Sequence, residues 1–115
     1  MCCVVSSRST DIYTGLPYDI GFFSFVTELI YKDLKQRLPK KTKKLSLGYT
    51  MMKTNFTQIY DKKRTSVLKL LKNNTKLSAY KIDMPEIHDA QETLNDIYNN
   101  TKHTAIMKWI DKHAQ

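Results

Sequence analysis

The sequence has little cysteine, glycine and proline, and it has no long apolar run. Its only cysteines, Cys2 and Cys3, are adjacent, so they offer neither a disulfide framework nor a spaced pair for zinc, and they indicate a reducing compartment. The most apolar run, residues 20–26, is too short to cross a bilayer, and no secretory signal opens the chain. We therefore expect a soluble, cytoplasmic protein without a membrane segment.

No metal site is expected either. The three histidines, His88, His103 and His113, lack metal-ligand spacing among themselves and are expected on the surface. The 115 residues fit one small domain, residues 1–115, with a modest core.

Positive charge is the strongest feature of the composition. Nineteen Lys and Arg residues against eleven Asp and Glu residues give a net charge of +8, which suits anionic partners such as nucleotides or nucleic acid. The basic runs at residues 40–44 and 62–64 are expected to be solvated, because no interleaved aromatic pattern for base stacking accompanies them. A small basic nucleic-acid-binding module stays open as an alternative function.

Hydrophobic periodicity predicts an α+β fold, with a mixed sheet of about three strands and flanking helices. Strands are expected over residues 2–5, 45–53 and 77–82. Helices are expected over residues 19–38, 54–72, 85–98 and 103–113, with a polar break in the second at residues 61–64. A turn at residues 14–17 and a lysine-rich loop at residues 39–44 connect these elements.

The segment between the first strand and the first helix combines groups that bind ligands. It contains a cation, hydroxyls, two carboxylates and a glycine within a short junction, in the order Arg8-Ser9-Thr10-Asp11 and then Gly15-Leu16-Pro17-Tyr18-Asp19. An arginine beside a serine hydroxyl can hold a phosphate, and Gly15 lets the backbone approach a planar ligand. Strand-to-helix junctions are common ligand sites.

These residues resemble a known family. Residues 1–20 are similar to the thymidylate synthase and pyrimidine hydroxymethylase family, in which a strand ending in Gln-Arg-Ser-x-Asp runs into Gly-Leu/Val-Pro-Phe-Asn and a helix. Residues 47–56, Leu-Gly-Tyr-Thr-Met-Met-Lys-Thr-Asn-Phe, are similar to that family's Leu-Gly-Asp-x-His-x-Tyr-x-Asn-His. The resemblance is clearest over residues 1–56, and it implies the C-terminal half of such an enzyme.

The resemblance implies a role for five residues. Arg8 and Ser9 would bind the phosphate of a pyrimidine nucleoside monophosphate, and Asp11 and Gly15 would line the floor shared by the base and methylenetetrahydrofolate. Asp19 stands where the family's synthases carry Asn. A carboxylate accepts from the exocyclic amine of cytosine and cannot donate to O4 of uracil, so Asp19 favours a cytidine-type substrate. The family works as homodimers built through their sheets.

Other positions depart from the family pattern. The nucleophilic cysteine would lie upstream of the opening strand, and Cys3 matches a second cysteine that the family directs into its core. Met51 and Lys53 replace the His and Tyr that contact the sugar, and Ser7 replaces the strand's Gln. We therefore expect no catalytic residue in this chain, no turnover by the chain alone, and association with a second copy or with the missing N-terminal half. A decayed, non-catalytic remnant is the other alternative.

Four of the five site residues also have a purely structural interpretation. Arg8 and Ser9 fit an exposed strand end without a ligand. Asp19 fits the N-cap of the helix over residues 19–38, and Asp11 fits a cap of the turn after the strand.

Overall fold

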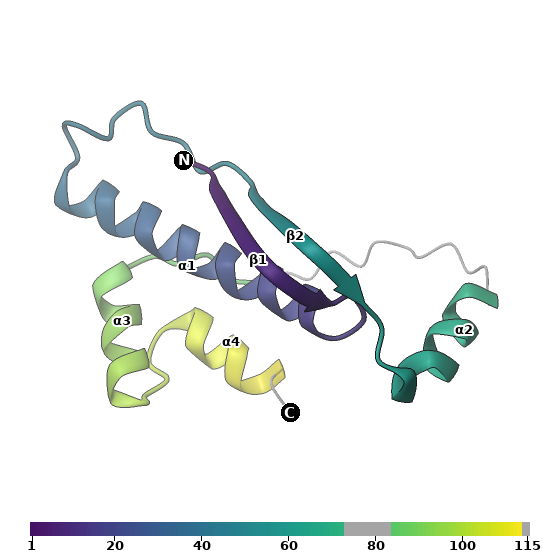
Figure 1. Ribbon diagram of the computed structural model, residues 1–115. Coiled ribbons are helices and arrows are strands. Elements are labelled where there is room, and N and C mark those ends of the chain that lie inside the picture. Colours follow the sequence, from purple (N-terminus) through teal and green to yellow (C-terminus); the bar gives the residue numbers. More distant parts are fainter. Residues whose placement is uncertain (73–83, 114–115) are drawn as a thin grey trace. The chain divides into compact units, whose positions relative to one another are not determined.

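The computed structural model describes residues 1–72 and 84–113, and their fold is mixed α+β (Figure 1). The elements follow the order β1 (Cys3–Asp11), α1 (Gly15–Arg37), β2 (Thr50–Gln58), η1 (Asp61–Lys63), α2 (Arg64–Lys72), α3 (Ala90–Asn99) and α4 (Ala105–His113). The α+β class is confirmed, and the described residues hold two strands where about three were expected. The third expected strand, residues 77–82, lies outside the described residues.

Contacts within the chain divide it into two compact units. The first, here the strand unit, comprises Cys2–Phe25 and Gly48–Tyr80, and the second, the helical unit, comprises Met1, Val26–Leu47 and Lys81–Gln115. Helix α1 contributes its first half to the strand unit and its second half to the helical unit. No described helix is both long and apolar enough to cross a membrane.

Strands β1 and β2 pair in parallel, in a register that runs from Cys3 opposite Thr50 to Asp11 opposite Gln58. Parallel neighbours need a long crossover, which residues 12–49 and helix α1 provide. Both strands extend further toward the carboxyl end than expected, and residues 54–58, expected as the start of a helix, belong to β2. The pairing of β2 with β1 decides this segment, because the β-branched and aromatic residues Thr54, Phe56 and Thr57 suit a strand once a partner lies beside them.

The polar break expected at residues 61–64 is confirmed. A short 3₁₀ turn, η1, covers Asp61–Lys63, and helix α2 starts at Arg64.

Helix α1 begins four residues earlier than expected, so the interpretation of Asp19 as its N-cap is wrong. The chain turns at residues 12–14 instead, because the Asp11 carboxylate accepts hydrogen bonds from the amides of Tyr13 and Thr14, at 3.1 and 3.2 Å. The interpretation of Asp11 as a cap of this turn is therefore confirmed. Pro17 is tolerated in the first turn of α1, where its missing N–H removes no helical hydrogen bond. Pro39 follows the end of the helix, as expected.

The buried apolar side chains of the described residues lie in the helical unit: Leu29, Ile87, Ala90 and Ile106. Polar side chains of α1 bind the segment that leads into α3. The Gln36 amide donates to Asp89 Oδ2 at 3.2 Å and accepts from the Ala90 amide at 3.3 Å. Glu28 accepts from the Ile87 amide at 3.2 Å. The polar positions beside the apolar stripe of α1 therefore bind another part of the chain.

Helix α3 begins at Ala90, five residues later than expected, because Asp89 is its N-cap. Its carboxylate accepts from the Glu92 amide at 2.9 Å. Asn100 ends the helix in the left-handed conformation, with φ of 53°. Helix α4 agrees with the expected helix over residues 103–113 to within two residues.

Candidate functional site

The junction at the carboxyl end of β1 brings together three of the five predicted site residues, Asp11, Gly15 and Asp19. Thr10 lies between them, with only 5 % of its surface exposed. Its hydroxyl donates to Asp19 Oδ2 at 3.3 Å, a bond that joins the end of β1 to the first turns of α1. The other oxygen, Asp19 Oδ1, makes no hydrogen bond with any residue in the ranges 1–72 and 84–113.

Gly15 starts α1 directly beside Thr10. A Cβ on residue 15 would stand 3.1 Å from Thr10 Oγ1 and 3.7 Å from Asp11 Cβ. The φ angle of Gly15 is not positive, so the position needs glycine for space rather than for a left-handed backbone. The sequence predicted that Gly15 lets the backbone approach a ligand. In the structure, the side of Gly15 that has no Cβ faces the Thr10 hydroxyl instead.

Arg8 and Ser9 are both exposed on β1. The Arg8 guanidinium makes no ion pair or hydrogen bond with any described residue, and the backbone carbonyl of Ser9 accepts from the Ser7 hydroxyl at 3.0 Å. Neither residue has a hydrogen bond to Asp19. Arg8 therefore presents a positive charge that no residue of the described ranges pairs, on the strand that leads to the junction.

The Asp11 carboxylate has a fixed structural role. Burial by itself would raise the pKa of Asp11, but the amides of Tyr13 and Thr14, the Thr14 side chain and the positive charge of Lys63 together hold that pKa below its ordinary value. Asp11 is therefore a carboxylate at neutral pH, with both oxygens bonded to the turn.

Two lysines that sequence reasoning assigned to solvent lie over aromatic rings near this junction. The Lys63 ammonium lies 5.7 Å from the ring centre of Tyr13, and the Lys62 ammonium lies 5.7 Å from that of Tyr60. The contact of Lys62 with Tyr60 spans two residues and could have been suspected from sequence. The contact of Lys63 with Tyr13 joins η1 to the turn after β1, and no local pattern indicates it.

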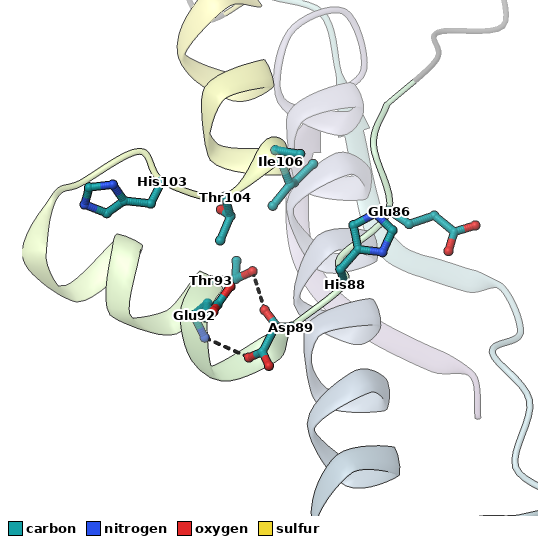
Figure 2. Close-up of a pocket in the computed structure, with 9 residues that line it drawn as sticks. Glu86, His88, Asp89, Glu92, Thr93, His103, Thr104 and Ile106 are labelled. Atoms are coloured by element: carbon teal, nitrogen blue, oxygen red, sulfur yellow. Dashed lines mark hydrogen bonds between the residues drawn. The ribbon is translucent and has the colours of Figure 1, made fainter.

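The helical unit contains a separate hollow of about 230 Å³, shown in Figure 2. Several of its lining side chains titrate: Glu86, His88, Asp89, Glu92 and His103. His88 and His103 lie on opposite sides of the hollow in Figure 2. Among the described residues no group of three His, Cys, Asp or Glu side chains could hold a metal ion. Asp89, which caps α3, is already engaged.

A buried carboxylate connects the two helices of this unit. Asp96 is 2 % exposed, and it accepts from the amides of His103 and Thr104 and from the hydroxyls of Thr101 and Thr104, at 2.7–3.0 Å. Burial would raise the pKa of Asp96, but these four donor groups outweigh it and hold the pKa well below its usual range. Asp96 thus satisfies the amides that precede α4 and has a structural role, which the sequence did not reveal.

Comparisons of the chain with protein-family models, with curated proteins and with solved structures find no match.

Proposed function

We propose that the carboxyl end of β1 and the start of α1 form one wall of a site for a pyrimidine nucleoside monophosphate. Arg8 binds the phosphate, and Asp19 contacts the base. Ser9, expected beside Arg8 at the phosphate, is the next residue of β1, so its side chain lies on the other face of the strand. The arrangement of strand, turn, helix and parallel strand supports this proposal, because ligands of α/β units bind beside the carboxyl ends of parallel strands. The observation that carries it is the bond from Thr10 to Asp19 Oδ2, which orients the carboxylate and leaves Oδ1 available.

The available oxygen of Asp19 favours cytosine over uracil. A carboxylate oxygen only accepts hydrogen bonds, so it matches the exocyclic amine of cytosine and leaves O4 of uracil without a donor. Thr10 supports this role, because its hydroxyl fixes the rotamer of Asp19 from a buried position. The substrate class that we propose is therefore a cytidine-type monophosphate.

The residues assigned to folate do not by themselves make a pterin site. Both carboxylate oxygens of Asp11 accept hydrogen bonds from backbone amides of the turn. The Thr10 hydroxyl occupies the space beside Gly15 where a Cβ would stand. Methylenetetrahydrofolate therefore stays an expectation of the family resemblance, and we derive no chemical step through it.

We propose a binding role without turnover by this chain alone, because its thiols lie at the wrong end of β1. Cys2 and Cys3 are its only cysteines, and the eight residue steps from Cys3 to Asp11 span about 26 Å of extended strand. Neither cysteine can therefore attack a base held at Asp19. A reacting thiol would come from a partner chain, either a second copy or an N-terminal half.

An exposed apolar side chain of the strand unit is consistent with such a partner. Phe56 is 70 % exposed, although it lies in the parallel pair, and its side chain lies on the face of β2 opposite to that of Lys53. Parallel sheets are normally covered on both faces, and a pair of strands alone is marginally stable.

Calorimetric titration of the chain with deoxycytidylate, deoxyuridylate and single-stranded DNA tests the proposal. We expect deoxycytidylate to bind more tightly than deoxyuridylate. Tighter binding of deoxyuridylate would overturn the role of Asp19. Binding to DNA with a steep salt dependence and no response to mononucleotides would favour the basic nucleic-acid-binding module instead. No binding to either would favour the decayed remnant.

A further inference from the structure

Among residues 1–72 and 84–113, one face of the β1–β2 pair is exposed from Val4 to Arg8. From Cys3 to Arg8 on β1 and from Thr50 to Asn55 on β2, exposed residues alternate with more covered ones, and the register aligns the two alternations. Beyond Arg8 and Asn55 the pattern breaks, because Thr10 is buried while Ser9 and residues 56–58 are all exposed. The alternating exposed positions are Val4, Ser6 and Arg8 on β1, and Met51, Lys53 and Asn55 on β2. Because side chains alternate between the faces of a strand, these six residues share one face.

Lys53 and Arg8 are diagonal neighbours on this open face. Lys53 lies opposite Ser6. Arg8 is two residues further along β1, between Ser7, which pairs with Thr54, and Ser9, which pairs with Phe56. Strand rise and spacing place the Cα atoms of Arg8 and Lys53 about 8 Å apart. Both side chains are long and flexible enough for their charged ends to contact one anion between them.

Neither cation is neutralised within the part of the chain that the structure describes. No ion pair or hydrogen bond joins Arg8 or Lys53 to residues 1–72 or 84–113. The one carboxylate in the two strands is Asp11, which is committed to the turn after β1. Two unpaired like charges repel one another, and a bound anion removes that repulsion.

The same face supplies neutral hydrogen-bond donors. Ser6 lies opposite Lys53, and Asn55 is the next residue on the exposed face of β2. A hydroxyl, an amide and two cations match the oxygens and double charge of a phosphate monoester. A nucleic-acid strand needs a track of cations, whereas Arg8 and Lys53 are the only cations of β1 and β2.

We infer that Lys53 binds the phosphate of the ligand together with Arg8, so that the open face of the sheet is a phosphate-monoester site with two cations. This inference rests on the proposed function and names a second cation for its phosphate. It also gives Lys53 a role of its own at the position where the similar family carries a sugar-binding tyrosine.

The test compares a nucleotide with its nucleoside. The full chain is titrated calorimetrically with deoxycytidylate and with deoxycytidine, as wild type, Lys53→Met, Lys53→Arg and the control Lys44→Met. Lys44 is an exposed lysine of the loop after α1, so its loss changes the net charge equally. Circular dichroism checks that each variant retains the wild-type fold.

We expect Lys53→Met to weaken deoxycytidylate binding about tenfold or more while deoxycytidine binding stays unchanged, because only the phosphate contact is lost. Lys53→Arg keeps the charge and should stay near wild type, as should Lys44→Met. A Lys53→Met variant that keeps the wild-type ratio of nucleotide to nucleoside affinity would overturn the inference and leave the proposed function standing.

Two further outcomes are decisive. A wild-type chain that binds neither ligand, or that binds both equally, overturns the proposed function and this inference together. If single-stranded DNA displaces deoxycytidylate at equal phosphate concentration, and Lys53→Met weakens both ligands equally, the face binds phosphodiesters and the monoester assignment is wrong.

Discussion

The Thr10 hydroxyl fills the space beside Gly15, because a Cβ on residue 15 would lie 3.1 Å from Thr10 Oγ1. Thr10 is buried and bonded to Asp19, so it cannot easily move away. We expect Gly15→Ala to destabilise the wild-type chain by about 1 kcal/mol through overpacking. Urea unfolding followed by circular dichroism measures this change.

The background Thr10→Ala provides the matched control. Without the hydroxyl, the added methyl group finds space and alanine gains its helical preference over glycine. Gly15→Ala should then be neutral or stabilising, which a double-mutant cycle reports as coupling between the two positions. Equal effects in both backgrounds would contradict the close contact.

Exchange of Asp19 for asparagine should reverse the base preference. The amide of Asp19→Asn can donate to O4 of uracil and accept from its N3–H, whereas the carboxylate can only accept. We expect the ratio of deoxycytidylate to deoxyuridylate affinity to shift by roughly tenfold toward deoxyuridylate in calorimetric titrations. Asp61→Asn, at an exposed position in η1, is the charge-matched control and should leave the ratio unchanged.

Asp96 should make the helical unit sensitive to acid. The pKa of Asp96 is lowered in the folded chain, so its contribution to stability is complete above its unfolded pKa of about 3.9 and is lost as the pH falls toward the folded pKa. Asp96→Asn removes the stabilisation that the charged carboxylate provides. It also replaces one acceptor oxygen by an NH₂ group, which would face donors such as the amide and hydroxyl of Thr104. The stability gap between wild type and Asp96→Asn should therefore be large at pH 6 and should shrink below pH of about 4.

Thermal unfolding followed by circular dichroism from pH 6 to pH 2 measures this gap. Asp111→Asn is the control, because the exposed ion pair of Asp111 with Lys102 is worth about 0–1 kcal/mol. A gap that stays constant over the whole pH range would show that the Asp96 charge does not stabilise the fold.

Gln36 should stabilise the start of α3 although it belongs to α1. Its amide both donates to Asp89 and accepts from Ala90, so Gln36→Leu loses two hydrogen bonds and should cost about 1 kcal/mol. Gln36→Glu keeps the acceptor but faces Asp89 with a second carboxylate, so its cost should rise with pH as the glutamate ionises. Urea unfolding at pH 4 and pH 7 compares the two variants, and equal costs at both pH values would contradict this arrangement.

Local patterns in the sequence predicted some elements well. The apolar stripe that ends before Pro39 predicted α1, and the polar run at residues 61–64 predicted the break between η1 and α2. Asp89 and Glu92 also form a capping pattern that could have placed the start of α3 correctly.

Other features depend on distant parts of the chain. Strand β2 was expected too early because its bounds follow from pairing with β1, across a connection that contains all of α1. Of the candidate site, the turn role of Asp11 was foreseen, whereas the bond from Thr10 to Asp19 requires the actual start of α1. The burial of Asp96 was not foreseen, because its donors gather only once α3 and α4 are joined.

The long connection between β1 and β2 has a consequence for how the chain acquires its structure. Two parallel strands cannot pair outward from a hairpin turn, so β1 and β2 meet only by closing the long connection of residues 12–49, which costs more chain entropy than a tight turn. Helix formation takes about a microsecond, whereas non-local strand pairing is far slower. The pairing of β1 with β2 is therefore expected to be slower than helix formation within α1, and it is the step at which the backbone groups of the two strands become each other's partners.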